Sequence, residues 1–274
     1  MGSIHSHDYM DTDQIEGRVL VVGFGNSGCD LAVDAAQHRF DVSIAVRRGQ
    51  LFQPKTLMGK PRSELSFLNE LPREQQNMLM NVLIYASKGS AGDYPGLPTP
   101  ETYDLDRQPP VVNDLLLYWI QHGRVKPVPG VADIEGKTVR FTDGTSDEYD
   151  TILWATGFNT RLPFLDDDLL EWEAGVPLRN AGEILPTTVE GLYFVGLCSP
   201  RGPQWPVYCA QSRLICEMLR TRAAGIDDLT ARFARGAAPE ARIDIIRHEW
   251  QADMDESWRR LSFIAPAEKA EKAA

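Results

Sequence analysis

Positively charged side chains are scarce in this sequence. It holds 28 Lys and Arg against 39 Asp and Glu, which gives a net charge of −11. Nucleic-acid binding depends on clustered cations that contact phosphates, so this balance argues against a nucleic-acid partner. An anionic ligand would need a local basic site that acts against the overall field of the protein.

Long apolar runs and metal-binding cysteine patterns are also lacking. No run approaches the roughly 18 residues that cross a bilayer, so no membrane segment is expected. Met1–Tyr9 is polar and carries two histidines, unlike a signal peptide. The four cysteines, Cys29, Cys198, Cys209 and Cys216, do not have the spacing of metal ligands. They are typical of reduced thiols, so we expect a cytoplasmic protein without a metal site.

What the sequence does contain is the pattern of an α/β fold. Its 274 residues exceed the usual size of one domain, so one large domain or two lobes are expected. Arg18–Val22 is a short apolar run typical of a buried parallel strand, and Asp41–Val46 has the same pattern. Asn26–His38 lies between them and carries apolar residues at helical spacing. This unit predicts a right-handed βαβ crossover and a parallel sheet.

The other predicted elements are less regular. Asp143 and Gly144 are typical turn residues, so the segments on either side predict a hairpin. The helix expected at Gln204–Arg222 has a candidate buried face of Val207, Ala210, Leu214 and Leu219. The remaining expectations are strands at Arg124–Pro127, Lys137–Phe141, Glu148–Trp154 and Gly191–Val195, helices at Ser63–Leu71, Glu74–Ser87 and Asn113–His122, an extended loop at Gly89–Pro110, and an amphipathic segment at Glu240–Phe263 before a frayed tail.

A glycine-rich loop follows the first strand and opens the helix. Its residues, Gly23, Phe24, Gly25, Asn26, Ser27 and Gly28, make a complete G-x-G-x-x-G. The first glycine permits a tight turn, the second lets a pyrophosphate approach the backbone, and the third allows close packing of helix and strand. Free N–H groups and the helix dipole favour the phosphates. The alternative is a glycine-rich turn without a ligand, but the context favours a dinucleotide site.

Two arginines end the second strand, where NAD-binding proteins usually place Asp or Glu for the ribose 2′-hydroxyl. A carboxylate there would repel a 2′-phosphate, whereas Arg47 and Arg48 can bind one through their guanidinium groups. A solvated pair of charges after a strand is the alternative. The sequence therefore predicts NADP(H) as the dinucleotide.

Further motifs occur in the order found in flavin-containing and Baeyer–Villiger monooxygenases. His5, Ser6 and Tyr9 match part of the family fingerprint that precedes the glycine-rich strand, although its leading Phe is absent. The other segments that resemble family motifs are Gly96–Pro100, Asp143–Thr145, Asp150–Phe158, Gly191–Gly196 and Gln204–Arg222. As an ordered set over residues 1–222, these motifs make the chain similar to the flavin-containing monooxygenase family.

This resemblance implies two cofactors, NADP(H) and FAD, and a small-molecule substrate that reacts with oxygen. In such enzymes NADPH reduces FAD, and the reduced flavin oxygenates a nucleophilic nitrogen or sulfur. Beside the loop and the two arginines, the family motifs imply cofactor contacts from His5, Ser6, Ala155, Thr156, Gly157, Gly196 and Gln204. No catalytic residue is assigned, and a homodimer is compatible with the sequence.

The family resemblance also implies an earlier G-x-G-x-x-G for the FAD pyrophosphate, and the sequence from Met1 to the glycine-rich loop does not contain one, so an incomplete FAD site or a fragment is expected. We therefore expect a linker with a fingerprint remnant at 1–16, a Rossmann-like NADP-binding domain at 17–154, the C-terminal part of an FAD-binding domain at 155–225, and a helical segment with a tail at 226–274. The alternative function is a non-catalytic NADP-binding module or fragment without a competent FAD site. A disulfide reductase is disfavoured because the cysteines form no Cys-x-x-Cys.

Three other features have simpler explanations than a site. His248 and Glu249 begin like a zinc-protease motif, but Ala252 stands where the second histidine belongs, so an exposed helical pair is expected. The acidic run Asp166–Asp168 is typical of an exposed helix start. Cys29 begins a helix, where a thiolate would be favoured, yet a small packing residue under the cofactor is the preferred interpretation.

Overall fold

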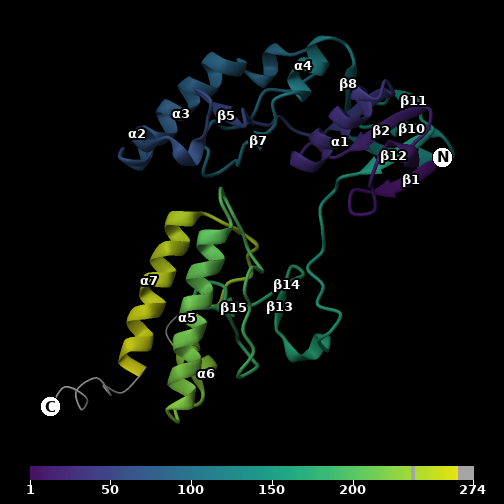
Figure 1. Ribbon diagram of the computed structural model, residues 1–274. Helices are drawn as coiled ribbons and strands as arrows, with labels where there is room; N and C mark the ends of the chain where they lie inside the picture. The colour runs from purple at the N-terminus through teal and green to yellow at the C-terminus, as the bar shows by residue number, and fades with distance from the viewer. Residues whose placement is uncertain (236–237, 265–274) are drawn as a thin grey trace. The chain divides into compact units, whose positions relative to one another are not determined.

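The computed structural model describes residues 1–235 and 238–264. The chain divides into two compact units, Met1–Gly157 and Phe158–Ala274 (Figure 1). The division falls three residues after the boundary expected at 154–155. Each unit is described by itself.

Unit 1 is built on the predicted parallel sheet. Its five strands are β1 (Gly2–His5), β12 (Thr151–Trp154), β2 (Arg18–Val22), β3 (Asp41–Val46) and β8 (Val125–Pro129), paired in that order and all parallel. The helix α1 (Asn26–Gln37) connects β2 to β3, as the βαβ pattern predicts. The α/β fold with a parallel sheet is therefore confirmed.

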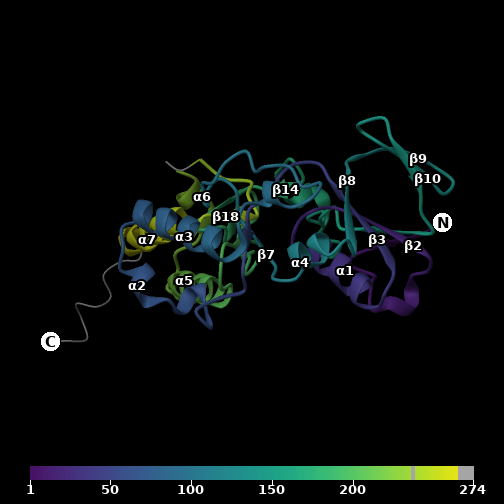
Figure 2. The ribbon, with the colours of Figure 1, turned by 90° about the horizontal axis from the view of Figure 1, so that it is seen from above.

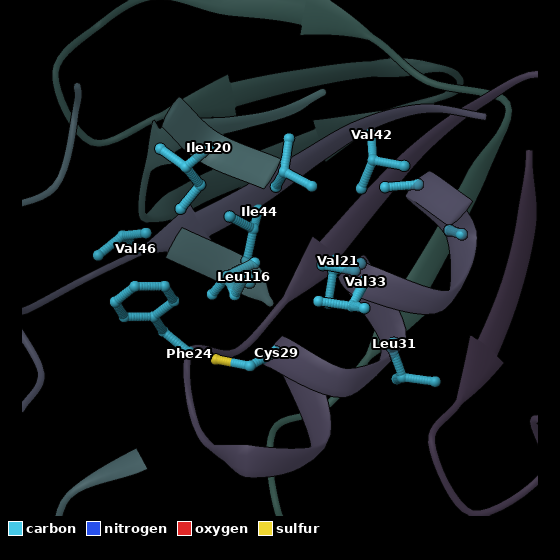
Figure 3. Packing of buried hydrophobic residues seen from close by; sticks show 14 of the residues in the cluster. Val21, Phe24, Cys29, Leu31, Val33, Val42, Ile44, Val46, Leu116 and Ile120 are labelled. Atoms are coloured by element: carbon cyan, nitrogen blue, oxygen red, sulfur yellow. The ribbon is translucent and has the colours of Figure 1, made fainter. Parts of the chain in front are cut away.

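Both faces of the sheet are covered. Successive side chains of a strand point to opposite faces, so Val19 and Val21 lie on one side and Leu20 on the other. The first side packs against α1 and α4 (Leu116–Gln121), and Figure 3 shows Leu31 and Val33 of α1 and Leu116 and Ile120 of α4 in this core. The second side packs against a meander of β9 (Val131–Glu135), β10 (Thr138–Phe141) and β11 (Ser146–Glu148). Figure 2 shows this meander and the two helices on opposite sides of the sheet.

Two strand predictions near the sheet edge were wrong in detail. Residues 1–16 were expected to be a linker, but Gly2–His5 forms β1 and pairs with β12, whose edge it covers. Glu148–Trp154 was expected to be one strand of the hairpin, yet β11 ends at Glu148 and β12 starts at Thr151. The break lets β11 pair with β10 while β12 enters the parallel sheet beside β2.

A long insertion separates β3 from α4. It contains β4 (Phe52–Gln53), β5 (Thr56–Leu57), β6 (Lys60–Pro61), α2 (Ser66–Asn69), α3 (Arg73–Lys88) and β7 (Val111–Val112), with short 3-10 turns at Arg62–Glu64 and Ala91–Asp93. The helix predicted at Ser63–Leu71 is shorter than expected. The helix predicted from Asn113 starts at Leu116, and the Asn113 side chain before it accepts the N–H groups of Leu115 and Leu116.

Unit 2 is a small core of helices and short strands. Its helices are α5 (Trp205–Ala223), α6 (Leu229–Ala234) and α7 (Arg247–Ile264), and its strands are β13 (Trp172–Glu173), β14 (Val176–Pro177), β15 (Arg179–Asn180), β16 (Leu185–Pro186), β17 (Ser199–Pro200) and β18 (Asp244–Ile245), with a 3-10 turn at Asp167–Leu169. Trp250 and Met254 of α7 pack with Val207 and Leu214 of α5. The predicted frayed tail at 265–274 lies outside the described residues.

Three predictions in unit 2 need correction. Gly191–Val195 is not a strand, since Gly191 has φ +85° and the segment makes no ladder with a neighbouring strand among the described residues. Leu219 is 49% exposed, whereas Met218 is buried, because the buried stripe steps by three and four residues from Val207. The amphipathic helix expected from Glu240 starts only at Arg247, after β18.

Candidate functional site

The glycine-rich loop turns sharply at the end of β2. Gly23 has φ +125°, a conformation that side-chain-bearing residues rarely adopt. A Cβ atom on Gly23 would collide with the carbonyl of Ala155, and one on Gly28 would collide with the carbonyl of Gly23. The first and third glycines therefore allow loop, helix and β12 to approach one another, as the motif predicts.

The middle of the loop is open. A Cβ atom on Gly25 would meet no atom within 4 Å, and Gly25, Asn26 and Ser27 are exposed. Gly25 precedes α1 without a side-chain cap. The first N–H groups of a helix have no intrahelical acceptor and lie at the positive end of the helix dipole. The loop is thus shaped to receive an anionic group at the start of α1.

The insertion closes over this loop. Asn26 accepts the N–H of Val112 through its side-chain oxygen at 2.8 Å, and the rings of Phe24 and Phe52 meet edge to face at 5.5 Å. The amide of Asn113 also donates to Asp30 of α1 at 2.8 Å. These contacts fix β4 and β7 against the start of the helix, so the insertion forms a wall of the site.

A cavity of about 330 Å³ lies between the loop and the insertion. Its wall contains Gly25 and Asn26 from the loop, Arg48 from the end of β3, and Arg107 and Gln108 from the insertion. Gln108 donates to the carbonyl of Gly49 at 2.8 Å and to the side-chain oxygen of Gln50 at 3.0 Å. The volume suits part of a dinucleotide, and Arg48 and Arg107 outweigh Glu101 in the lining, which gives the cavity a local positive charge.

The two predicted arginines occupy different positions. Arg48 lines the cavity, whereas Arg47 is exposed and lies beside Gly130, just past the end of β8. Neither forms an ion pair with a carboxylate of the described residues. Both guanidinium groups are therefore available to an anion in this part of the structure.

Sequence reasoning missed Arg107. It lies in the predicted extended loop and pairs with Asp104 at 3.6 Å, while its side chain is 82% exposed. No local pattern marks this residue, because only the folding of the insertion onto the loop brings it to the cavity. Thr102 and Gln50 line the same wall and were missed for the same reason.

The fingerprint residues and the ATG segment lie side by side. β1 pairs with β12 in a register that places His5 opposite Trp154. His5 donates from Nε2 to the carbonyl of Gly157 at 3.1 Å, while its Nδ1 accepts the N–H of His7 at 3.2 Å. The N–H of Ser6 donates to the carbonyl of Trp154 at 2.8 Å. Thus His5 and Ser6 adjoin the segment of Ala155, Thr156 and Gly157.

Gly196 and Gln204 belong to unit 2. The N–H of Gly196 donates to the side-chain oxygen of Gln211 at 3.0 Å, and Gly196 has φ +76°. Gln204 is exposed and immediately precedes α5. Gly196 therefore contacts the side of α5, and Gln204 stands at its beginning.

Two other sequence interpretations agree with the structure. Cys29 is buried, and burial raises the pKa of its thiol, so it is a packing residue rather than a thiolate. His248 and Glu249 are exposed on α7. Within the described part of the chain, no helix combines the length and apolarity that a membrane crossing requires.

Comparison with known proteins identifies the family. Residues 2–229 match the family model described as flavin-binding monooxygenase-like. The chain belongs to this family. A rice protein (Oryza sativa subsp. japonica), indole-3-pyruvate monooxygenase YUCCA1, is 31% identical over 207 residues, which cover 71% of this chain and 50% of the relative. Guinea-pig (Cavia porcellus) flavin-containing monooxygenase 5 is 26% identical over 270 residues, which cover 94% of this chain and 50% of the relative.

A solved structure supports the fold of this family member. Cyclohexanone monooxygenase from Rhodococcus sp. Phi1 bound to NADP⁺ matches with a TM-score of 0.58 at 13% identity, covering 96% of this chain and 68% of that one. The resemblance to flavin-dependent oxidoreductases that act as monooxygenases is thereby confirmed at the level of the family, whose cofactors are FAD and NADPH. The chain spans about half the length of the curated relatives named above.

Proposed function

We propose that unit 1 binds NADP(H) at the loop Gly23–Gly28. The observation that carries this proposal is the open backbone at Gly25 beside the first turn of α1, with Arg48 in the same cavity. The N–H groups of Asn26, Ser27 and Gly28 would hold the pyrophosphate, which the helix dipole also stabilises. Phe24 would hold the loop in place, since its ring is buried and packs against the ring of Phe52.

Arg47 and Arg48 would bind the 2′-phosphate of the dinucleotide. A dianionic phosphate that accepts from a guanidinium gains a charge-assisted bond, which the hydroxyl of NAD(H) cannot match. Arg107 of the insertion would add a third cation when its guanidinium group leaves Asp104 and pairs with the phosphate instead. The site therefore favours NADP(H) over NAD(H).

His5, Ser6, Ala155, Thr156 and Gly157 would border the nicotinamide half of the dinucleotide. This role follows from their position at the carboxyl ends of β1 and β12, which lie on the other side of β2 from β3 and its arginines. The hydrogen bond from His5 to the Gly157 carbonyl would hold the segment in place. Gly196 and Gln204 of unit 2 would contact the flavin.

The activity that fits these features is an NADPH- and FAD-dependent monooxygenation of a small molecule. When bound, FAD supplies the chemistry, accepting a hydride from NADPH and activating oxygen. The chain's own residues would orient the dinucleotide and keep water from its nicotinamide half. We propose a nucleophilic nitrogen or sulfur as the oxygenated atom, in keeping with the family resemblance. A cytoplasmic location and a homodimer stay predictions.

The visible absorption spectrum of the purified chain, before and after addition of FAD, tests the flavin part of the proposal. We expect flavin bands that remain after desalting, and NADPH consumption that depends on FAD and oxygen. NADP⁺ binding should be measured on the same samples by calorimetry. A colourless chain that binds NADP⁺ but no FAD would instead identify a non-catalytic NADP-binding module.

A further inference from the structure

A second cavity in unit 1 has a different chemistry from the cavity at the glycine-rich loop. It measures about 490 Å³ and lies between α3, the segment of β4, and α4. Its apolar lining includes Leu51, Phe52, Val82, Ile84, Tyr85 and Leu117. This volume lies in the range of pockets that enclose small organic molecules, roughly 300–1,000 Å³.

The wall and the mouth of this apolar pocket differ in burial. Leu51, Phe52, Ile84 and Leu117 are at most 7% exposed, because they belong to the hydrophobic cores of unit 1. Packing within a core holds such side chains in place, so the wall is preformed. The mouth is formed by residues of which Val82 is 59%, Tyr85 66% and Tyr103 48% exposed.

Among the described residues, the lining contains no Lys, Arg, Asp, Glu or His. Its polar side chains are those of Gln50, Asn81, Ser90 and the two tyrosines, and several of these bond to one another. Asn81 donates to the carbonyl of Tyr103 at 2.8 Å, and the hydroxyl groups of Ser90 and Tyr103 lie 3.2 Å apart. Phosphate groups would find no cation here, whereas Arg48 and Arg107 line the neighbouring cavity. Within the part of the chain that the structure describes, Gln50 is the one residue that lines both cavities.

We propose that the apolar pocket binds an uncharged, largely apolar small molecule, distinct from the dinucleotide. Burial of apolar ligand surface against the preformed wall would supply most of the affinity. The amide of Gln50 and the hydroxyl of Ser90 can orient one polar group of the ligand. This proposal concerns unit 1 alone, so it does not depend on flavin binding or on turnover.

Titration with N-phenylnaphthylamine, an uncharged fluorophore that brightens in apolar surroundings, tests the pocket. The informative variant is Ala86→Trp, because Ala86 lines the pocket from the exposed side of α3 and a tryptophan there fills it. The matched control is Ser87→Trp, an exposed neighbour on the same helix outside the pocket lining. Thermal melting of both variants checks that they fold.

We expect one saturable site in the wild-type chain, at least roughly tenfold weaker in Ala86→Trp and unchanged within about twofold in Ser87→Trp. NADP⁺ should not displace the fluorophore. The proposal is overturned if saturable binding is absent, if both tryptophan variants bind alike, or if NADP⁺ competes for the fluorophore's site. Each of these results is independent of whether the chain carries FAD.

Discussion

The carbonyl oxygen of Gly23 lies in the space that a Cβ atom on Gly28 would occupy. The first and last glycines of the loop therefore touch across the turn, and this contact sets the distance between β2 and α1. Gly25 lies between them, and no atom is near the position of a Cβ atom on it. Substitution of Gly28 should therefore lower stability, whereas substitution of Gly25 should lower dinucleotide affinity.

Gly28→Ala should destabilise unit 1. The added Cβ atom meets backbone rather than a flexible side chain, so the loop or the helix must shift, at a cost of about 2 kcal/mol or more in the free energy of unfolding. Chemical denaturation measures this change. A variant as stable as the wild-type chain would contradict the close packing of this turn.

Gly25→Ala should fold but bind NADP⁺ poorly. Its backbone, at φ −94°, is accessible to alanine, and the loss of a favourable N-cap glycine should cost less than about 1 kcal/mol of stability. The methyl group would stand where the pyrophosphate approaches, so we expect affinity to fall by roughly tenfold or more. Calorimetry with NADP⁺, beside a thermal melt, separates this result from misfolding.

Arg48→Ala should weaken NADP⁺ binding while leaving NAD⁺ binding almost unchanged. One charge-assisted bond to the 2′-phosphate corresponds to roughly 10- to 100-fold in affinity. Arg124→Ala is the matched control, since Arg124 is also exposed but does not line the cavity. Equal losses for the two dinucleotides would mean that Arg48 contacts the shared pyrophosphate instead.

The ion pair between Arg18 and Asp147 should make stability depend on pH. Arg18 donates two bonds of 2.7 Å to the Asp147 carboxylate and lies over the ring of Tyr149 at 5.2 Å. Hydrogen bonding by Arg18 lowers the pKa of Asp147 from 3.8 to about 2. Because the pKa is lowered in the folded chain, this stabilisation is present above pH 3.8 and is lost as the pH falls toward 2.

Asp147→Asn should therefore lower the free energy of unfolding by about 1 kcal/mol at neutral pH. The expected loss is small because solvent screens this partly exposed ion pair. The difference from the wild-type chain should shrink as the pH falls from 4 toward 2, a range set by the two pKa values. Denaturant unfolding across this range gives the comparison. A difference that persists at the lowest pH would point to a loss other than the ion pair.

Arg179→Ala should strongly destabilise unit 2. The Arg179 side chain is fully buried, pairs with the buried Glu183 at 3.3 Å, and donates to the carbonyls of Leu197 and Arg242. Burial raises the pKa of Glu183, so this carboxylate depends on its cationic neighbours. Removal of one partner from a buried pair typically costs about 3–5 kcal/mol.

Arg220→Ala supplies the contrast within the same unit. Arg220 pairs with Glu217 on the exposed side of α5, where an ion pair contributes less than about 1 kcal/mol. In thermal denaturation, the melting temperature of Arg179→Ala should be several degrees lower than that of Arg220→Ala. Similar melting temperatures would show that the buried pair contributes little.

Much of the site could be predicted because its signals are local. The alternation and spacing of apolar residues in Arg18–Val22, Asn26–His38 and Asp41–Val46 specify a strand, a helix and a strand, and the glycines mark the turn between the first two. Gly191–Val195 shows the limit of such signals. The segment is apolar enough for a strand, but a strand requires a ladder of bonds to a neighbour, and among the described residues a backbone bond from Phe194 to the carbonyl of Ile184 does not extend into one.

The sequence alone determined the family, from motifs that follow one another along residues 1–222, and the parallel βαβ unit with its glycine-rich turn, from residues close together in the chain. Only the tertiary structure decided that Gly2–His5 joins the sheet, that His5 bonds Gly157, and that Arg107 shares a cavity with Arg48. These partners are separated by many residues. Their meeting depends on strand order and on the packing of the insertion, which local periodicity does not encode.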